Sequence, residues 1–126
     1  MAIPTNRPLK DYTLSRFTTS IATTPVAAQV VVAFSGRILK TQGVSYGTTT
    51  GTTAVAVAIN GGSAISSAAL SISAGGAGVE VESTVSTTDF NAAQVKDGDV
   101  ISFTPTGGTG SSIGGSFTAL MRQGAS

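Results

Sequence analysis

The stretch Thr53–Ile65, which reads TAVAVAINGGSAI, decides the fold class of this chain. From Thr53 to Ile59, alanine alternates with valine or isoleucine. This period of two predicts a β-strand and excludes an amphipathic helix. Asn60-Gly61 follows directly, and both residues tolerate the positive φ angles of a tight hairpin turn. The stretch therefore predicts a strand, a turn and the start of a return strand.

Similar alternating stretches recur along the chain at a spacing of about ten residues. Strands are predicted over residues 26–34, 37–46, 53–59, 68–73, 79–85, 100–104 and 116–122, with a further short strand over 12–17. Residues 88–95 are expected to hold one helical turn. About eight strands without a helix between them predict an all-β fold, a single antiparallel β-sandwich with a jelly roll as the leading choice.

The composition indicates a β-rich domain with few charges. Of the 126 residues only 10% are charged, and 19 Thr and 16 Ser are expected to face the solvent in their place. With five Phe, two Tyr and no Trp, the core must consist mainly of Ala, Val and Ile. Cys and His are absent, which excludes disulfides and Cys/His metal sites. The sequence shows neither the apolar segment of a signal peptide nor an apolar run long enough for a membrane-spanning helix.

The first 25 residues differ from the rest in composition. They carry three of the four prolines, and three basic residues against one acidic residue. We therefore expect an extended basic arm over residues 1–25 and a β-sandwich domain over residues 26–126. The arm is either a frayed terminus or a segment that lies on a neighbouring molecule. For the second interpretation the candidate contact residues are Arg7, Lys10, Tyr12, Leu14, Arg16 and Phe17.

A long uncharged stretch follows in the middle of the chain. Between Lys40 and Glu80 lie 39 residues without a charged side chain. Exposed strands of a monomer usually carry charges, which keep them soluble and prevent edge pairing, so this stretch is expected to lie against another subunit. Its candidate interface residues are Ala54, Ala56 and Ala58. The alternative, that these alanines face the second half of the same sandwich, stays open.

The residues give no support for catalysis, and no catalytic residue, cofactor or metal site is assigned. Glu80 and Glu82 share one strand face about 6.5–7 Å apart. Glycosidase carboxylates must instead face each other across a cleft, so a solvated strand face is expected. Asp97-Gly98-Asp99 is expected to be a turn, and calcium binding near Asp97 and Asp99 stays open because the EF-hand spacing is missing. Without a basic patch interleaved with aromatic residues, no nucleic-acid partner is expected. No membrane and no small-molecule substrate are expected either.

Three segments together resemble a known family: VVVAFSGRILKTQGVSYGTTTGTTAVAVAINGGSAI, LSISAGG and VKDGDVISFTPTGGTGSSIGGSFTALMR. Over residues 26–122 their layout resembles the small jelly-roll head decoration (cement) proteins of tailed phages. It is more loosely similar to the tumour-necrosis-factor-like jelly rolls of phage fibres. The resemblance implies a homotrimer on the outer surface of an icosahedral capsid that bridges neighbouring copies of the major capsid protein, after assembly in the host cytoplasm.

Two alternatives to the decoration hypothesis remain. A fibre, tail or baseplate module would carry a shaft in the same chain. A carbohydrate-binding module would expose aromatic residues, and two tyrosines without tryptophan give this hypothesis little support.

Overall fold

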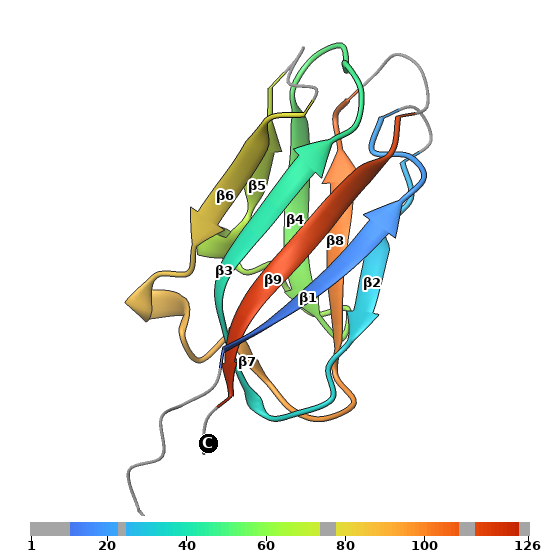
Figure 1. Ribbon diagram of the computed structural model, residues 1–126. Helices are drawn as coiled ribbons and strands as arrows, with labels where there is room; N and C mark the ends of the chain where they lie inside the picture. The colour runs from blue at the N-terminus through green and yellow to red at the C-terminus, as the bar shows by residue number, and fades with distance from the viewer. Residues whose placement is uncertain (1–10, 23–24, 74–77, 109–112, 124–126) are drawn as a thin grey trace, which may run out of the picture.

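The computed structural model of the protein describes residues 11–22, 25–73, 78–108 and 113–123 (Figure 1). Within these ranges the chain forms β-strands and two short 3-10 turns, with no α-helix. The strands are β1 (Asp11–Thr18), β2 (Ala28–Val31), β3 (Gly36–Ser45), β4 (Thr53–Ile59), β5 (Leu70–Ile72), β6 (Glu80–Thr84), β7 (Gln94–Val95), β8 (Val100–Thr106) and β9 (Gly115–Gln123). The 3-10 turns are η1 (Ser66–Ala68) and η2 (Thr87–Asp89). In these described ranges no helix is long and apolar enough to cross a membrane.

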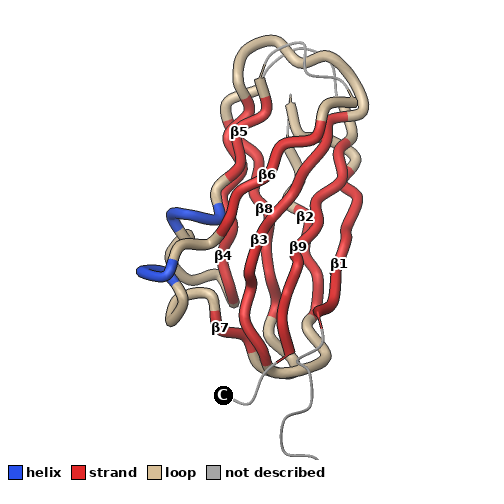
Figure 2. Tube along the Cα trace, turned by 60° about the vertical axis from the view of Figure 1, so that its left-hand side comes forward, coloured by secondary structure: helices blue, strands red, loops and turns tan. Residues whose placement is uncertain are grey.

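The strands form two antiparallel sheets that pack face to face (Figures 1 and 2). The five-stranded sheet has the order β1-β9-β3-β6, with β7 also paired to β3, and the four-stranded sheet has the order β2-β8-β4-β5. The first half of the chain pairs with the second half in reverse order: β1 with β9, β2 with β8, β3 with β6 and β4 with β5. A chain folded back on itself in this way and rolled into two sheets is a jelly roll. The predicted all-β sandwich is confirmed.

The core lies between the two sheets and is centred on two aromatic rings. Phe103 of β8 and Phe117 of β9 are fully buried, and their rings stack with centroids 5.3 Å apart at an angle of 8°. Gly43 lies opposite Phe117 in the β3–β9 ladder, and a Cβ atom at Gly43 would come within 2.9 Å of the Phe117 ring. Gly43 therefore makes room for the ring. A glycine inside a strand can also mark a bulge, but the register shift of β3 lies between Ile38 and Lys40.

The turn after β4 is present, although the return strand is not adjacent to it. Asn60 has φ 54° and Gly61 φ 71°, and the Gly62 N–H donates to the Ile59 carbonyl at 3.0 Å. The returning chain then passes through η1, and β5 begins only at Leu70, where it pairs with Val55. The predicted strand and turn are confirmed, while the immediate hairpin is wrong.

Two other strands differ from their predicted extent because of their place in the sheet. A strand was predicted over residues 26–34, but β2 is a four-residue edge strand, and Val31 is 63% exposed. Strand β8 was predicted over residues 100–104, but it continues through Pro105 to Thr106. The ladder between β2 and β8 stops at the pair Ala28–Phe103, so β8 beyond Phe103 pairs only with β4, and one proline is tolerated there.

Several hydroxyl side chains lie inside the sandwich, contrary to the expectation that Ser and Thr face the solvent. Thr41 is fully buried, and its Oγ1 donates to the Ala68 carbonyl oxygen at 2.7 Å. Thr18 is also buried and donates to the Val26 carbonyl oxygen at 2.6 Å. These bonds satisfy groups that would otherwise be costly to bury.

The short strand expected near the N-terminus is part of the sandwich. Residues 11–18 form β1, which pairs with β9 along its whole length as an edge strand. The ring of Tyr12 lies 4.7 Å from that of Phe34, and Leu14 packs against the core. These contacts hold residues 11–18 in the sheet. A free arm, expected over residues 1–25, can therefore comprise only residues 1–10, which lie outside the described residues.

Candidate interaction surfaces

The outer face of the four-stranded sheet carries no charged side chain. Its outward-facing residues follow from the registers of β2, β8, β4 and β5. They are Gln29, Val31, Ala54, Ala56, Ala58, Ser71, Val100, Ser102, Thr104 and Thr106. We call this surface the uncharged face. A broad sheet surface of small uncharged side chains can approach another sheet or subunit closely without burying an unpaired charge.

The three candidate alanines lie on this uncharged face. Ala54 and Ala56 are exposed and Ala58 is partly exposed, whereas Val55 and Val57 between them are at most 1% exposed and face the core. The alanines therefore point away from the second sheet, as the period of two requires. Their role in subunit contact stays a prediction.

The opposite surface of the sandwich, the outer face of the five-stranded sheet, is charged. Asp11 and Arg122 form an ion pair at 2.9 Å between β1 and β9, and Lys40 and Glu82 form one at 3.0 Å between β3 and β6. We call this surface the charged face. These two ion pairs both lie on the charged face. We therefore interpret the charged face as solvated and the uncharged face as the one suited to protein contact.

The candidate arm residues divide into three groups. Tyr12 and Leu14 are used in packing within the sandwich. Arg16 and Phe17 remain exposed on β1, and the Phe17 ring stacks on Tyr46 with centroids 5.5 Å apart. Arg7 and Lys10 lie outside the described residues. The structure therefore leaves only part of this set available for a contact with another molecule.

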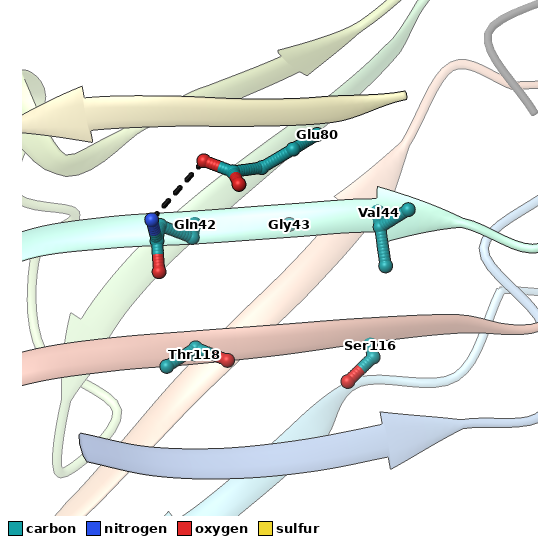
Figure 3. A pocket seen from close by; sticks show the side chains of 6 residues that line it. All are labelled: Gln42, Gly43, Val44, Glu80, Ser116 and Thr118. Atoms are coloured by element: carbon teal, nitrogen blue, oxygen red, sulfur yellow. Dashed lines mark hydrogen bonds between the residues drawn. The ribbon is translucent and has the colours of Figure 1, made fainter. Parts of the chain in front are cut away.

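A hollow of about 310 Å³ lies on the charged face where β6, β3 and β9 run side by side (Figure 3). It is lined by Gln42, Gly43, Val44, Glu80, Ser116 and Thr118. The Gln42 side-chain amide donates to Glu80 at 3.1 Å and to Glu82 at 3.4 Å. Glu80 and Glu82 thus stand in a row on one strand and share one amide, so they do not face each other across a cleft. The sequence did not predict this hollow, because its walls come from strands far apart in the chain.

The Asp97-Gly98-Asp99 segment forms a turn before β8. The Asp99 carboxylate accepts hydrogen bonds from the Asn60 amide at 3.0 Å and from the Lys96 backbone N–H at 2.8 Å. The side-chain amide oxygen of Asn60 (Oδ1) in turn accepts a hydrogen bond from the Val100 N–H at 2.9 Å. These bonds join the turn to the end of β4. Across the described part of the chain, no three or more acidic, Cys or His side chains are grouped as metal ligands.

Four carboxylates accept hydrogen bonds that hold their pKa values below the usual range: Asp11, Glu82, Asp89 and Asp99. In the same order, the leading side-chain donors are Arg122, Lys40, Ser67 and Asn60. The Asp89 bonds connect η2 to η1, because Asp89 Oδ2 accepts from Ser67 Oγ at 2.6 Å and from Ser67 N at 3.0 Å. Charged carboxylates therefore help to hold the loops at the sides of the sandwich.

We expect the protein to lose stability in acid, because these pKa values are lower in the folded than in the unfolded chain. The stabilisation is present at neutral pH and is lost in acid, as the pH falls below the ordinary carboxyl range and through the lowered folded-state pKa values. Urea unfolding at about pH 7 and about pH 2.5 should show a lower midpoint in acid. The variant Asp89→Asn should have a lower urea midpoint at neutral pH than the unaltered chain. The difference between its midpoints at neutral and acid pH should therefore be smaller. The control is Asn91→Ala, at an exposed residue, which should keep the difference between the two midpoints of the unaltered chain. If Asp89→Asn also keeps that difference, the Asp89 carboxylate does not contribute to stability at neutral pH.

Comparison with known proteins gives a match in fold only. No protein-family model and no curated protein sequence matches the chain. Among solved structures, a chain of "Capsid of Ralstonia phage GP4" aligns with a TM-score of 0.56 over 100% of this chain and 93% of its own length. The two chains share a fold. At 14% sequence identity the likeness extends to the arrangement of strands and not to particular side chains.

Proposed function

We propose that the protein is a structural protein of a phage virion, a head decoration protein that binds the outer surface of the capsid. The observation that carries this proposal is the fold match to a chain of a phage capsid structure over nearly the full length of both chains. Its assembly would take place in the host cytoplasm, before or after closure of the shell.

The uncharged face supports a homotrimer as the bound form. Ala54, Ala56 and Ala58 would bring the β4 strands of neighbouring subunits close together, with no charge to desolvate. The core contains few aromatic residues, and association adds stability to such a fold by mass action. The charged face then stays in contact with water.

The basic N-terminal segment is the proposed capsid contact. Arg7 and Lys10 would bind acidic groups of the major capsid protein, with exposed Arg16 on the neighbouring strand β1. Three such segments on one trimer would bridge adjacent capsid subunits, and their combined binding would exceed that of one segment through effective concentration.

The experiment that tests this function is co-sedimentation with empty heads of the phage that encodes the chain, assembled without the native protein. We expect the full chain to sediment with the heads, and a variant that lacks residues 1–10 to bind at least about a hundredfold more weakly. A longer deletion is unsuitable because it would remove β1. Lys96→Ala, at an exposed lysine in the turn before β8, is the matched control for lost positive charge.

The outcomes separate the parts of the proposal. Failure of the full chain to sediment with the heads would contradict the decoration function. Full binding by the shortened variant, with an unchanged circular dichroism spectrum, would contradict the role of residues 1–10 and leave the decoration function in place.

A further inference from the structure

We propose that the hollow on the charged face binds a neutral saccharide. This inference does not depend on the proposed virion function, because the hollow lies on the face opposite the proposed subunit contact. A protein assembled through the uncharged face would keep the hollow open to solvent.

The strand registers bring the relevant side chains into two adjacent rows across the sheet. In the first row, Phe17 of β1 lies opposite Ser116 of β9, which lies opposite Val44 of β3, which lies opposite Glu80 of β6. The second row holds Ser15, Thr118, Gln42 and Glu82 in the same strand order. Both rows face outward, so the hollow is bordered by carboxylates on β6 and by hydroxyls on β9.

The polar groups of the hollow suit a ligand with several hydroxyl groups. The Glu80 carboxylate accepts hydrogen bonds, and the Ser116 and Thr118 hydroxyls both donate and accept them. In Figure 3 the Gln42 amide nitrogen points toward Glu80, and its carbonyl oxygen lies on the side of Thr118. The walls on β6 and β9 are two strand spacings apart, about 9–10 Å. That separation allows a sugar ring to place hydroxyls against both walls.

These polar groups are also held in place before a ligand arrives. Gln42 is fixed by its bonds to both glutamates, and Thr118 Oγ1 forms a hydrogen bond with Ser15 Oγ at 2.8 Å. Side chains fixed in this way lose little conformational entropy on binding, which favours association with a small ligand. The volume of about 310 Å³ is at the lower end of the range for small-molecule sites.

An exposed aromatic pair stands at the end of the hollow. Phe17 lies directly opposite Ser116, and its ring stacks on Tyr46 at 5.5 Å and 20°. Phe17 is 51% exposed and Tyr46 59% exposed. The two stacked rings form one continuous exposed apolar surface, and such surfaces can border ligand-binding grooves. They offer an apolar surface to the C–H face of a sugar ring, while the hydroxyls meet the rows beside them.

The lining residues disfavour three other ligand classes, namely anions, divalent metals and wholly apolar ligands. An anion would meet the carboxylates of Glu80 and Glu82 with no cationic side chain among the lining residues. A divalent metal would find its two carboxylates on one strand, where both already hold the Gln42 amide. A wholly apolar ligand would leave Gln42, Glu80, Ser116 and Thr118 without water or hydrogen-bond partners. A neutral polyhydroxyl ligand satisfies all of these groups.

The test is amide chemical-shift titration of the full chain with cellobiose, lactose and N,N′-diacetylchitobiose as probes. We expect saturable shifts at Gln42, Gly43, Ser116 and Thr118 with at least one disaccharide, and a dissociation constant on the order of 1 mM, as suits a shallow site. Thr118→Ala should weaken binding about fivefold through a lost hydrogen bond. Phe17→Ala should weaken it to a similar or greater extent. Thr13→Ala, an exposed outward-facing threonine on β1, is the matched control and should bind as the unaltered chain does.

Three results would overturn the proposal. The first is the absence of saturable shifts with all three disaccharides. The second is a set of shifts located on the uncharged face and not around the hollow. The third is binding of a cationic probe, N-acetyl-arginine amide, at the hollow without binding of any sugar, which would assign the site to basic peptide segments. Because capsid heads are not used, none of these results bears on the decoration function.

Discussion

Replacing Phe117 by alanine should lower the free energy of unfolding by about 3–5 kcal/mol, enough to unfold much of the protein under mild conditions. Phe117 is fully buried on β9, the strand between β1 and β3 in the five-stranded sheet, and its ring stacks on Phe103 of the other sheet. The substitution removes a large apolar group and leaves a cavity that the two sheets cannot easily close. The core contains few other aromatic rings that could compensate.

Urea denaturation followed by circular dichroism, at one protein concentration for all variants, measures this loss. Phe17→Ala is the matched control, because Phe17 is half-exposed and its loss should cost about 1 kcal/mol or less. Phe117→Leu should cost less than about 1.5 kcal/mol, since most of the volume remains. A loss below about 1 kcal/mol in Phe117→Ala would show that the contact between the sheets does not depend on this ring pair.

Replacing Ala56 by lysine should convert the proposed trimer into a monomer. The side chain of Ala56 is exposed in the single chain, so the lysine is tolerated in the monomer. At a subunit contact made by the uncharged face, the same lysine would place an unpaired charge against small neutral side chains. The cost of about 3 kcal/mol or more per contact corresponds to more than a hundredfold weaker association.

Light scattering gives a direct measurement of this effect. The unaltered chain should have a mass near three times 12.4 kDa, and Ala56→Lys a mass near 12.4 kDa. Thr13→Lys adds the same charge on the charged face and should leave the trimer intact, as should the conservative Ala56→Ser. A monomeric unaltered chain would contradict a trimer in solution, and a trimeric Ala56→Lys variant would move the contact away from this face.

The sequence predicted strands such as β4 and β9 well because each of them carries its own period of two. The clean alternation from Val55 to Ile59 also predicted correctly that Ala54 and Ala56 face away from the valines. The alternation could not show whether the second sheet packs against the alanines or against the valines. Only the structure shows that the valines face the core and the alanines face outward. The extent of β8 was misjudged for a similar reason, since Pro105 is tolerated only because β2 ends before it.

The candidate sites could not be predicted from the sequence because they depend on pairing between strands that are far apart in the chain. The hollow requires Glu80 to lie beside Val44 and Ser116 beside Phe17, and no local pattern specifies these registers. The place of β1 in the sheet could not be predicted from local sequence either, because its basic residues and the nearby prolines indicated an extended arm. Its Leu14 finds a place against the core only after β9, more than a hundred residues later, is in position.

The reverse-order pairing of the strands has a consequence for synthesis. Strand β9 follows all the other described strands in chain order, yet it is an inner strand that joins β1 to β3. Until β9 has emerged from the ribosome, the five-stranded sheet lacks this strand, and the inner face of the emerging chain is open to other chains. The sandwich can therefore close only after residue 123 has emerged, and the few charges of the earlier strands make that interval the time when the chain most needs a chaperone.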